Sequence, residues 1–458
     1  MKYFSTRNKK TSLGFADIFQ RGLAPDGGLF IPHKIKKFNK SQLTKLRKLN
    51  YNDLALEIIA DFCKPDIERK KLKTLIKNSY KSFKNKNTVS LIDLGNFKLL
   101  ELYHGPTLAF KDIAMQAIGH MYEEFNKSKD GVTNIVVATS GDTGAAAISA
   151  LSNRKNINLF VLHPHNKISK IQRKIMTTIG GKNIYNLAVK GSFDDCQKIV
   201  KEMFADNLFR QTINMSGVNS INWARIIFQI VYYFYAYFKI RSKKINFSVP
   251  TGNFGDIYAG YLAKKMGLPI NKLIVATNQN DILHRAISKG SYEAEKVSET
   301  ISPSMDIQIA SNFERLIFDL NNEDDKQTTL DMKNIKENGK YLIGDDKLNK
   351  IRENFLSASL SENETLEVIK KVYEKFSVVL DPHTAIGYGA FDKHNLKGNN
   401  IVLATAHPCK FPDAVSKAIN LKSDLPKELE FILNEKEDYD IVENNLEKIK
   451  NYIIGKTK

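Results

Sequence analysis

The chain has 458 residues, 42% of them hydrophobic and 26% charged, which is ordinary for a folded protein and long enough for two or three domains. Its net charge is +19, but the lysines are spread along the whole sequence without a basic stripe, so we expect no nucleic-acid partner. The three cysteines, Cys63, Cys196 and Cys409, form neither a CxxC pair nor a Cys/His cluster. We therefore expect no metal site, no disulfide framework and a cytoplasmic location.

Residues 1–85 are rich in lysine and are predicted to form a mainly helical N-terminal domain after an irregular start. The start contains a Pro-Asp-Gly-Gly turn signal within residues 22–32. The first 14 residues lack the apolar segment of a secretory signal.

Lys111 is the first candidate for chemistry. It ends a short His-Gly-Pro-Thr turn at residues 104–112 and opens an amphipathic helix, so its neighbours are core-forming residues. A lysine held against apolar walls loses hydration, which lowers the pKa of its amine and lets the amine attack a carbonyl. The alternative is a helix-start lysine whose amine reaches water. The loops described below favour the catalytic interpretation.

From about residue 90 the pattern alternates between strands and helices, which predicts open, mostly parallel sheets covered on both faces. We predict strands at 134–139, 158–162, 184–189, 247–249, 273–277 and 401–405, and helices at 143–151, 169–179, 194–205, 257–265 and 281–287. The apolar stretch 226–238 is too short to span a membrane and is predicted to be a buried helix, so we expect no membrane partner. The polar stretch 320–345 is predicted to be a loop or insertion.

Two glycine-containing loops follow predicted strands and open helices. In residues 249–256, Gly252 and Gly255 let the backbone approach an anion at a helix start, which suits a single phosphate group. Residues 139–144 present the hydroxyls of Ser140 and Thr143 to a carboxylate or phosphate. Each loop also has a purely structural explanation, as a βα turn or as a helix N-cap.

The strand end at residues 403–412 places Thr405 at its tip, where a neutral hydroxyl can bond a ring nitrogen. Lys410 and Arg225 are cations near predicted element ends that could pair with a substrate phosphate. For both, a solvated surface charge is the alternative.

Together, residues 104–112, the Ser-Gly-Asp-Thr-Gly loop, the Gly-Asn-Phe-Gly loop and the Ala-Thr-Ala-His-Pro strand end resemble the threonine synthase family. Residues 3–7, 22–32, 219–225 and 302–307 also resemble that family, in its branch with an N-terminal extension. The resemblance implies an α/β protein with two doubly wound open-sheet domains of the tryptophan synthase β-like class, known as fold-type II, plus a helical N-terminal region. The core would span 86–458, with a smaller sheet domain at about 90–215 and a larger one at about 216–458.

The resemblance also implies a cofactor and a reaction. The cofactor would be pyridoxal 5'-phosphate, and the enzyme would be a lyase that converts O-phospho-L-homoserine and water to L-threonine and phosphate, the last step of threonine biosynthesis. Lys111 would bind the cofactor covalently and move protons. The residues implied in cofactor binding are Lys111, Gly252, Asn253, Phe254, Gly255, Thr405 and Asp142. Those implied in substrate binding are Ser140, Gly141, Thr143, Arg225 and Lys410.

Three alternatives stay open at the level of sequence. The chain could be a serine/threonine dehydratase or phospho-lyase that releases 2-oxobutyrate, a non-catalytic phosphoamino-acid binding protein, or a basic nucleic-acid-binding protein. The sequence leaves open a monomer or a homodimer, any allosteric effector, the role of the N-terminal region, and the residues that hold the substrate phosphate and shuttle each proton.

Overall fold

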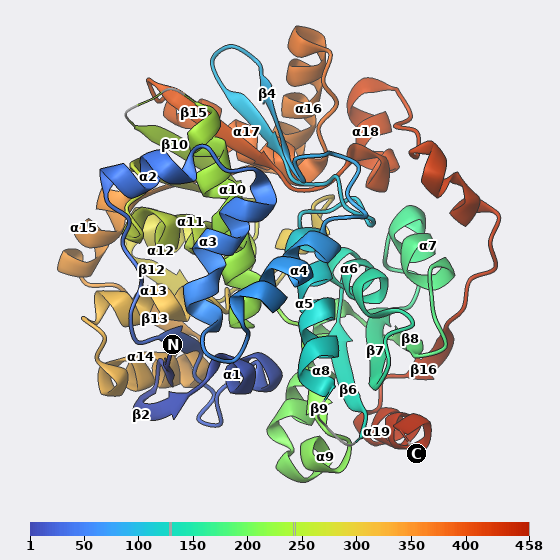
Figure 1. Ribbon diagram of the computed structural model, residues 1–458. Helices are drawn as coiled ribbons and strands as arrows, with labels where there is room; N and C mark the ends of the chain where they lie inside the picture. Colours follow the sequence, from blue (N-terminus) through green and yellow to red (C-terminus); the bar gives the residue numbers. More distant parts are fainter. Residues whose placement is uncertain (128–130, 241, 243, 458) are drawn as a thin grey trace.

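The computed structural model describes residues 1–127, 131–240, 242 and 244–457. Two sheets with helices packed against them stand side by side, and the N-terminal helices lie against the long helix at the centre (Figure 1). This is the α/β architecture with two open sheets that the sequence predicts.

The larger sheet has six strands in the order β14-β11-β10-β15-β5-β4, parallel except for the edge strand β4. Its strands are β4 (Ser90–Asp93), β5 (Lys98–Glu101), β10 (Ile245–Pro250), β11 (Ile270–Thr277), β14 (Phe355–Ser359) and β15 (Asn399–Ala404). The helices around it are α10 (Trp223–Lys239), α11 (Gly255–Lys265), α12 (Ile282–Lys289), α15 (Asp345–Asn354), α16 (Glu362–Phe376), α17 (Pro382–His394) and α18 (Pro412–Ile419).

The smaller sheet has five strands in the order β16-β8-β7-β6-β9, and every pair is parallel. Its strands are β6 (Thr133–Ala138), β7 (Ile157–Pro164), β8 (Ile184–Lys190), β9 (Met215–Ser216) and β16 (Asp440–Glu443). Its helices are α5 (Lys111–Asn126), α6 (Asp142–Leu151), α7 (Lys170–Thr178), α8 (Phe193–Ala205), α9 (Asn207–Thr212) and α19 (Leu446–Thr457). The strands and helices predicted from sequence are all present, with ends that differ by a few residues.

The two sheets do not divide the chain at the predicted boundaries. β4 and β5 belong to the larger sheet, although residues from about 90 were expected in the smaller domain. β16 belongs to the smaller sheet, although residues after 216 were expected in the larger one. The reason is long-range pairing, since β5 pairs with β15 from Lys98↔Ile401 to Glu101↔Ala404, a partner that no local pattern reveals.

The N-terminal region differs from the predicted irregular start. β1 (Tyr3–Ser5), β2 (Asn8–Leu13) and β3 (Phe30–Pro32) form a small antiparallel sheet, and β1 is its central strand. Four helices accompany it, namely α1 (Phe15–Arg21), α2 (Lys40–Leu46), α3 (Tyr51–Cys63) and α4 (Arg69–Ser79). The aromatic ring of Tyr3 packs edge-on against Trp223 of α10, so this region shares its core with the helices and strands of the rest of the chain.

The apolar stretch at 226–238 lies in α10, a helix buried almost throughout and packed against α3, α5 and α11. It is therefore the buried helix that the sequence predicts. Among the described residues, no helix has both the length and the hydrophobicity needed to cross a membrane.

The predicted loop at 320–345 is wrong. Most of it is α14 (Asp325–Asn338), which follows α13 (Phe313–Leu320) and precedes β13 (Lys340–Leu342), the partner of β12 (Ser291–Glu293). Asp324 caps α14 by accepting hydrogen bonds from the backbone N–H groups of Lys326 and Gln327. The buried face of α14 includes Thr328 and Asp331. The Asn321 side-chain amide donates hydrogen bonds to Thr328 and Asp331, so both can be buried. The helix therefore packs without the apolar stripe from which a helix is predicted.

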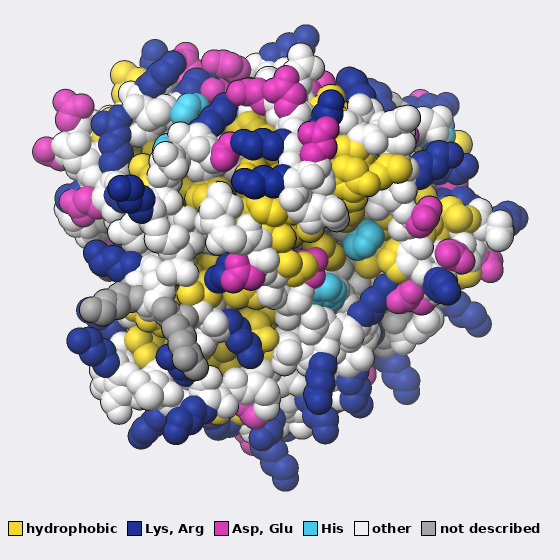
Figure 2. Space-filling model, turned by 90° about the horizontal axis from the view of Figure 1, so that it is seen from above, with side chains coloured by type: hydrophobic (Ala, Val, Ile, Leu, Met, Phe, Trp, Pro, Cys, Tyr) yellow, Lys and Arg dark blue, Asp and Glu magenta, His cyan; other side chains and the backbone are white. Residues whose placement is uncertain are grey.

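On the face in Figure 2, Lys and Arg side chains lie both at the rim and near the middle, with Asp and Glu side chains among them. The short 3₁₀ helices η1 (Pro303–Met305), η2 (Pro408–Lys410) and η3 (Lys427–Leu433) complete the described elements.

Candidate active site

A cavity of about 960 Å³ collects residues from both sheets and from the N-terminal region. The lining contains ten of the twelve residues proposed from sequence: Lys111, Ser140, Asp142, Thr143, Arg225, Gly252, Asn253, Phe254, Gly255 and Thr405. Gly141 and Lys410 are not among its lining residues. Eight of these ten residues lie just after β6, β10 or β15, so the cavity lies at the carboxyl ends of parallel strands; Lys111 opens α5 and Arg225 lies in α10.

The turn before Lys111 is fixed by a buried carboxylate. Asp112 accepts hydrogen bonds from the Thr107 backbone N–H at 2.8 Å and from the Thr107 hydroxyl at 2.6 Å. A Cβ atom on Gly105 would lie 2.4 Å from the Cβ of Asp112, so only glycine fits there. The Phe110 N–H also donates to the Thr405 carbonyl at 2.8 Å. These contacts hold Lys111 at the start of α5 beside the Thr405 strand end.

Lys111 is 9% exposed, and its amine has two side-chain hydrogen-bond partners in the described structure. Its Nζ lies 3.3 Å from Asp142 Oδ2 and 3.5 Å from Ser304 Oγ. Burial lowers its pKa from the ordinary value; Asp142 opposes that effect, while Lys410 and Arg225 add to it. The amine is therefore more readily neutral than a surface lysine, as the sequence predicts for a nucleophile.

Asp142 is the partner of three donors. Its Oδ1 lies 2.5 Å from Lys410 Nζ and accepts from Gln172 Nε2 at 2.9 Å, while its Oδ2 faces Lys111. Burial raises the pKa of this carboxyl, but Lys410 and Lys111 outweigh burial, so the pKa lies well below its usual range. Asp142 therefore stays ionised and can pair with both lysine amines.

Lys410 lies behind Asp142, outside the lining of the cavity. It is fully buried, and its amine also donates to the Thr107 carbonyl at 2.9 Å. Its described partners are thus groups of the protein, and its assignment as a substrate ligand stays a prediction.

The loop after β10 is shaped for a close backbone approach. Phe254 has a left-handed backbone, with φ of 62°, and no side chain within the described structure caps the start of α11. A Cβ on Gly252 would lie 2.7 Å from the Ser304 carbonyl oxygen. The Asn253 carbonyl accepts from the Asn312 backbone N–H at 3.0 Å, which anchors the loop. The free N–H groups of the first helical turn are left for an anion.

The loop after β6 is stabilised by Thr139. Its hydroxyl oxygen accepts from the N–H groups of Gly141 and Gly144, both at 2.9 Å, so neither Asp142 nor Thr143 makes the cap. The Ser140 and Thr143 side chains remain on the cavity lining.

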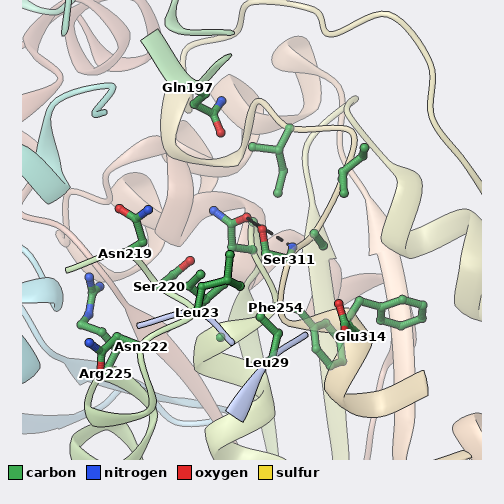
Figure 3. Close-up of a pocket in the computed structure, with 18 of the residues that line it drawn as sticks. Leu23, Leu29, Gln197, Asn219, Ser220, Asn222, Arg225, Phe254, Ser311 and Glu314 are labelled. Atoms are coloured by element: carbon green, nitrogen blue, oxygen red, sulfur yellow. Dashed lines mark hydrogen bonds between the residues drawn. The ribbon is translucent and has the colours of Figure 1, made fainter. Parts of the chain in front are cut away.

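Arg225 enters the cavity from the first turn of α10. Its Nη1 donates to the Val218 carbonyl at 3.1 Å, its Nε has no partner in the described structure, and burial lowers its pKa to about 10. Figure 3 shows it on one side of the pocket with Asn219, Ser220 and Asn222, while Ser311 and Glu314 lie on the other side. An unpaired buried cation in a cavity is suited to an anionic ligand.

The comparisons with known proteins agree along the whole chain. Residues 2–80 match the family description of the threonine synthase N terminus, 95–348 that of pyridoxal-phosphate dependent enzymes, and 384–453 that of the threonine synthase C-terminal part. Threonine synthase of Pseudomonas aeruginosa is 42% identical over 99% of this chain and 98% of its own length. Threonine synthase of Saccharomyces cerevisiae is 42% identical over 97% of each chain.

A solved structure agrees equally well. The crystal structure of pyridoxal phosphate-bound threonine synthase from Brucella melitensis covers 100% of both chains with a TM-score of 0.95 and 42% identity. This chain belongs to the threonine synthase family. It is a pyridoxal phosphate-dependent enzyme of fold-type II, as the motifs in its sequence predict.

The residues present fit the cofactor of this family. A buried amine of lowered pKa faces the cavity, residues 252–255 line it with backbone, and no side chain caps the start of α11 in the described structure, which leaves N–H groups for a phosphate. Lys111, the loop residues Gly252 to Gly255 and Thr405 would hold it.

Sequence reasoning assigned no role to Ser304, His383 or Asp256, all of which line the cavity. Ser304 lies in the Ser-Pro-Ser-Met-Asp-Ile stretch that resembles the family. His383 follows an Asp-Pro pair that caps and opens α17, a signal that indicates a helix start and not a site. Asp256 directly follows the Gly-Asn-Phe-Gly loop, so its position could have been noticed.

Proposed function

We propose that this chain converts O-phospho-L-homoserine and water to L-threonine and phosphate, the last step of threonine biosynthesis. The observation that carries the proposal is the Lys111 amine, buried between the Asp142 carboxylate and the Ser304 hydroxyl in a cavity with two anion-suited loops. Support also comes from full-length similarity to threonine synthases.

Each group of residues has a separate task in this proposal. When bound, pyridoxal phosphate supplies an electron sink for the carbons of the substrate. The Gly252 loop holds the cofactor phosphate with backbone N–H groups, and Thr405 offers a neutral hydroxyl to the ring nitrogen. Ser140, Gly141 and Thr143 bind the substrate carboxylate. Arg225 is the cavity cation that we assign to the substrate phosphate.

Proton movement is assigned to Lys111. Its lowered pKa makes the neutral amine accessible, so Nζ can take a proton from a substrate carbon and return one later. Asp142, held ionised by Lys410, keeps the amine in place by accepting one of its hydrogen bonds. Low exposure of Lys111, Asp142 and Thr405 excludes bulk water, which would otherwise compete at these atoms.

Product analysis tests the proposal. Protein loaded with pyridoxal phosphate is incubated with O-phosphohomoserine, and we expect equal amounts of threonine and phosphate. Lys111→Ala abolishes both products, whereas the control Lys265→Ala, which removes a lysine paired with Asp319 outside the cavity lining, keeps them. Phosphate with 2-oxobutyrate would identify a lyase instead. No turnover despite cofactor binding would favour a binding protein.

We also infer a cytoplasmic enzyme whose partner is this small-molecule substrate, without a nucleic-acid or membrane partner. The support is that Cys63, Cys196 and Cys409 are free and buried, which suits a reducing compartment. Sedimentation of the purified protein distinguishes a monomer from a homodimer.

A further inference from the structure

The turn around Ser304 contacts the Lys111 amine, which we propose as the reacting group, and also contacts His383 and Gly252. It is part of η1, between β12 and α13, and its sequence, Ser-Pro-Ser-Met-Asp-Ile at 302–307, has so far been given no role. Ser304 Oγ lies 3.5 Å from Lys111 Nζ. The other side-chain partner of the amine is Asp142 on α6, next to the smaller sheet, so Lys111 is held from both sides of the cavity.

The backbone of Ser304 is fixed at two atoms. Its N–H donates to His383 Nε2 at 3.3 Å. Its carbonyl oxygen packs against the Gly252 loop, because a Cβ on Gly252 would lie 2.7 Å from that oxygen. A shift of this turn would therefore disturb the lysine contact and the Gly252 loop together.

His383 is itself fixed by a buried carboxylate. Its Nδ1 lies 2.9 Å from Asp381 Oδ1, and the two residues are 3% and 1% exposed. Because a carboxylate accepts the Nδ1 proton, Nε2 keeps its lone pair and can accept the Ser304 N–H. Asp381 also accepts from the Thr384 hydroxyl, which in turn accepts from the Thr405 N–H at 3.3 Å. One carboxylate thus links the Ser304 turn to the Thr405 strand end.

We propose that Ser304 is a catalytic residue that binds the Lys111 amine through its hydroxyl, and that Asp381 and His383 are positioning residues that hold Ser304 in place. The inference rests on the proposed function in one respect, the assignment of Lys111 as the reacting lysine. Ser304 complements Asp142 because a hydroxyl carries no charge and binds the amine in its charged and neutral forms.

The charged and titratable groups around the amine come from several elements. They are Asp142 on α6, Lys410 on η2, Arg225 on α10, Asp256 on α11 and the Asp381–His383 pair on α17. Substitution of the neutral Ser304 leaves all of them unchanged, so a shifted pH profile reports the lost hydroxyl.

The test measures Lys111 directly, without turnover. Full-length protein freed of cofactor is exposed to pyridoxal phosphate across a pH series, reduced with borohydride, and the label at Lys111 is quantified by peptide mass. Ser304→Ala removes a charge-assisted hydrogen bond to the ammonium form, so we expect its labelling midpoint to move about 0.5 pH unit lower. Ser304→Thr keeps the hydroxyl and should keep the wild-type midpoint.

The positioning role is tested by a double-variant cycle. His383→Leu should shift the midpoint in the same direction, and the double variant with Ser304→Ala should shift it no further than Ser304→Ala alone. The matched control is Ser357→Ala, because Ser357 on β14 contacts His284 at 3.0 Å and lies outside the cavity lining.

Two results would overturn the inference. The first is an unchanged midpoint in Ser304→Ala, and the second is a His383→Leu shift that persists in full without the Ser304 hydroxyl. Failure of the proposed reaction is separate, since a wild-type protein labelled at Lys111 can still give the wrong product. Absence of any label at Lys111 would overturn both.

Discussion

Asp142 and Asp256 occupy equivalent places in the two halves of the molecule. Each lies in the first turn of a helix that directly follows a strand, α6 after β6 and α11 after β10. Both are buried, with exposures of 2% and 7%, and both line the same cavity.

Their partners nevertheless give them opposite protonation behaviour. Asp142 pairs with Lys410 and Lys111, and its pKa is held well below the usual range. Asp256 accepts hydrogen bonds from the Tyr232 and Tyr233 hydroxyls, its Oδ2 has no partner in the described structure, and burial raises its pKa to about 6. Burial and a helix start are common to both residues, so the direct ion pairs of Asp142 with the Lys111 and Lys410 amines account for the opposite direction of its pKa shift.

The largest effect should come from removal of the lysine that touches Asp142. Lys111→Ala removes the amine that binds the cofactor and moves protons, so we expect turnover to fall by at least about 10³-fold and the visible absorbance of bound cofactor to vanish. Steady-state assays and absorption spectra check this. Asp256→Asn, which leaves Lys111 in place, should keep the absorbance. Loss of the absorbance in that variant would contradict the separate roles of the two carboxylates.

The next largest effect is a difference in the free energy of unfolding between variants of the two carboxylates. Asp142→Asn leaves Lys410 buried without its carboxylate, and we expect a cost of about 3–5 kcal/mol in the free energy of unfolding. At pH 7, Asp256→Asn keeps an oxygen for both tyrosines and should cost about 1 kcal/mol or less. Urea denaturation of the two variants measures the difference, and equal costs would contradict the assignment of charge to Asp142.

The pH dependence of stability should also differ between the two residues. The folded-state pKa of Asp256 is about 6, above that of an unfolded aspartate at about 3.9, so its contribution is present at low pH and lost as pH rises through 6. Relative to Asp256→Asn, the wild type should lose about 2–3 kcal/mol between pH 4 and pH 7.

Asp142 has the opposite sign, because its folded-state pKa is lowered. Its contribution is present above about pH 3.9 and is lost as pH falls further. Thermal unfolding of the wild type and both variants across pH 3–8 checks these directions. Parallel profiles for the wild type and Asp256→Asn would show that the Asp256 carboxyl is not shifted.

The smallest effect concerns the loop before Asp256. Gly252→Ala places a Cβ 2.7 Å from the Ser304 backbone oxygen, so the loop must move, and we expect cofactor affinity to fall about 10-fold. Gly255→Ala is the matched control, because its Cβ would meet only side-chain atoms, the nearest of them the Asn312 amide nitrogen at 3.2 Å and Ile226 Cδ1 at 3.6 Å. Fluorescence titration with pyridoxal phosphate compares them. An equal loss in both variants would place the constraint at the helix start instead of at Ser304.

The sequence predicts most of what is local. Hydrophobic alternation predicts the strands and helices around both sheets, and the glycine loops after β6 and β10 are visible because a phosphate-suited turn needs small residues. Lys111 could be singled out since its own neighbours are core-forming. The loops after β10 and β15 come together because parallel strands of one sheet end at the same edge, whereas the loop after β6 comes from the other sheet.

The remainder depends on contacts between distant segments. Asp142 and Lys410 are 268 positions apart and Lys111 and Ser304 are 193 apart in the chain, so no local pattern links them. β16 joins the smaller sheet for the same reason, through pairing with β8. α14 was not predicted, because its buried face carries hydrogen-bonded polar residues in place of an apolar stripe.

Mapping the site of cofactor attachment shows directly whether Lys111 is the reacting amine. The protein loaded with pyridoxal phosphate is reduced with borohydride and digested, and the modified lysine is identified by peptide mass. We expect a single modified peptide with the label on Lys111. A label on Lys410, the other lysine that contacts Asp142, would contradict it, because the reacting amine would then lie behind Asp142.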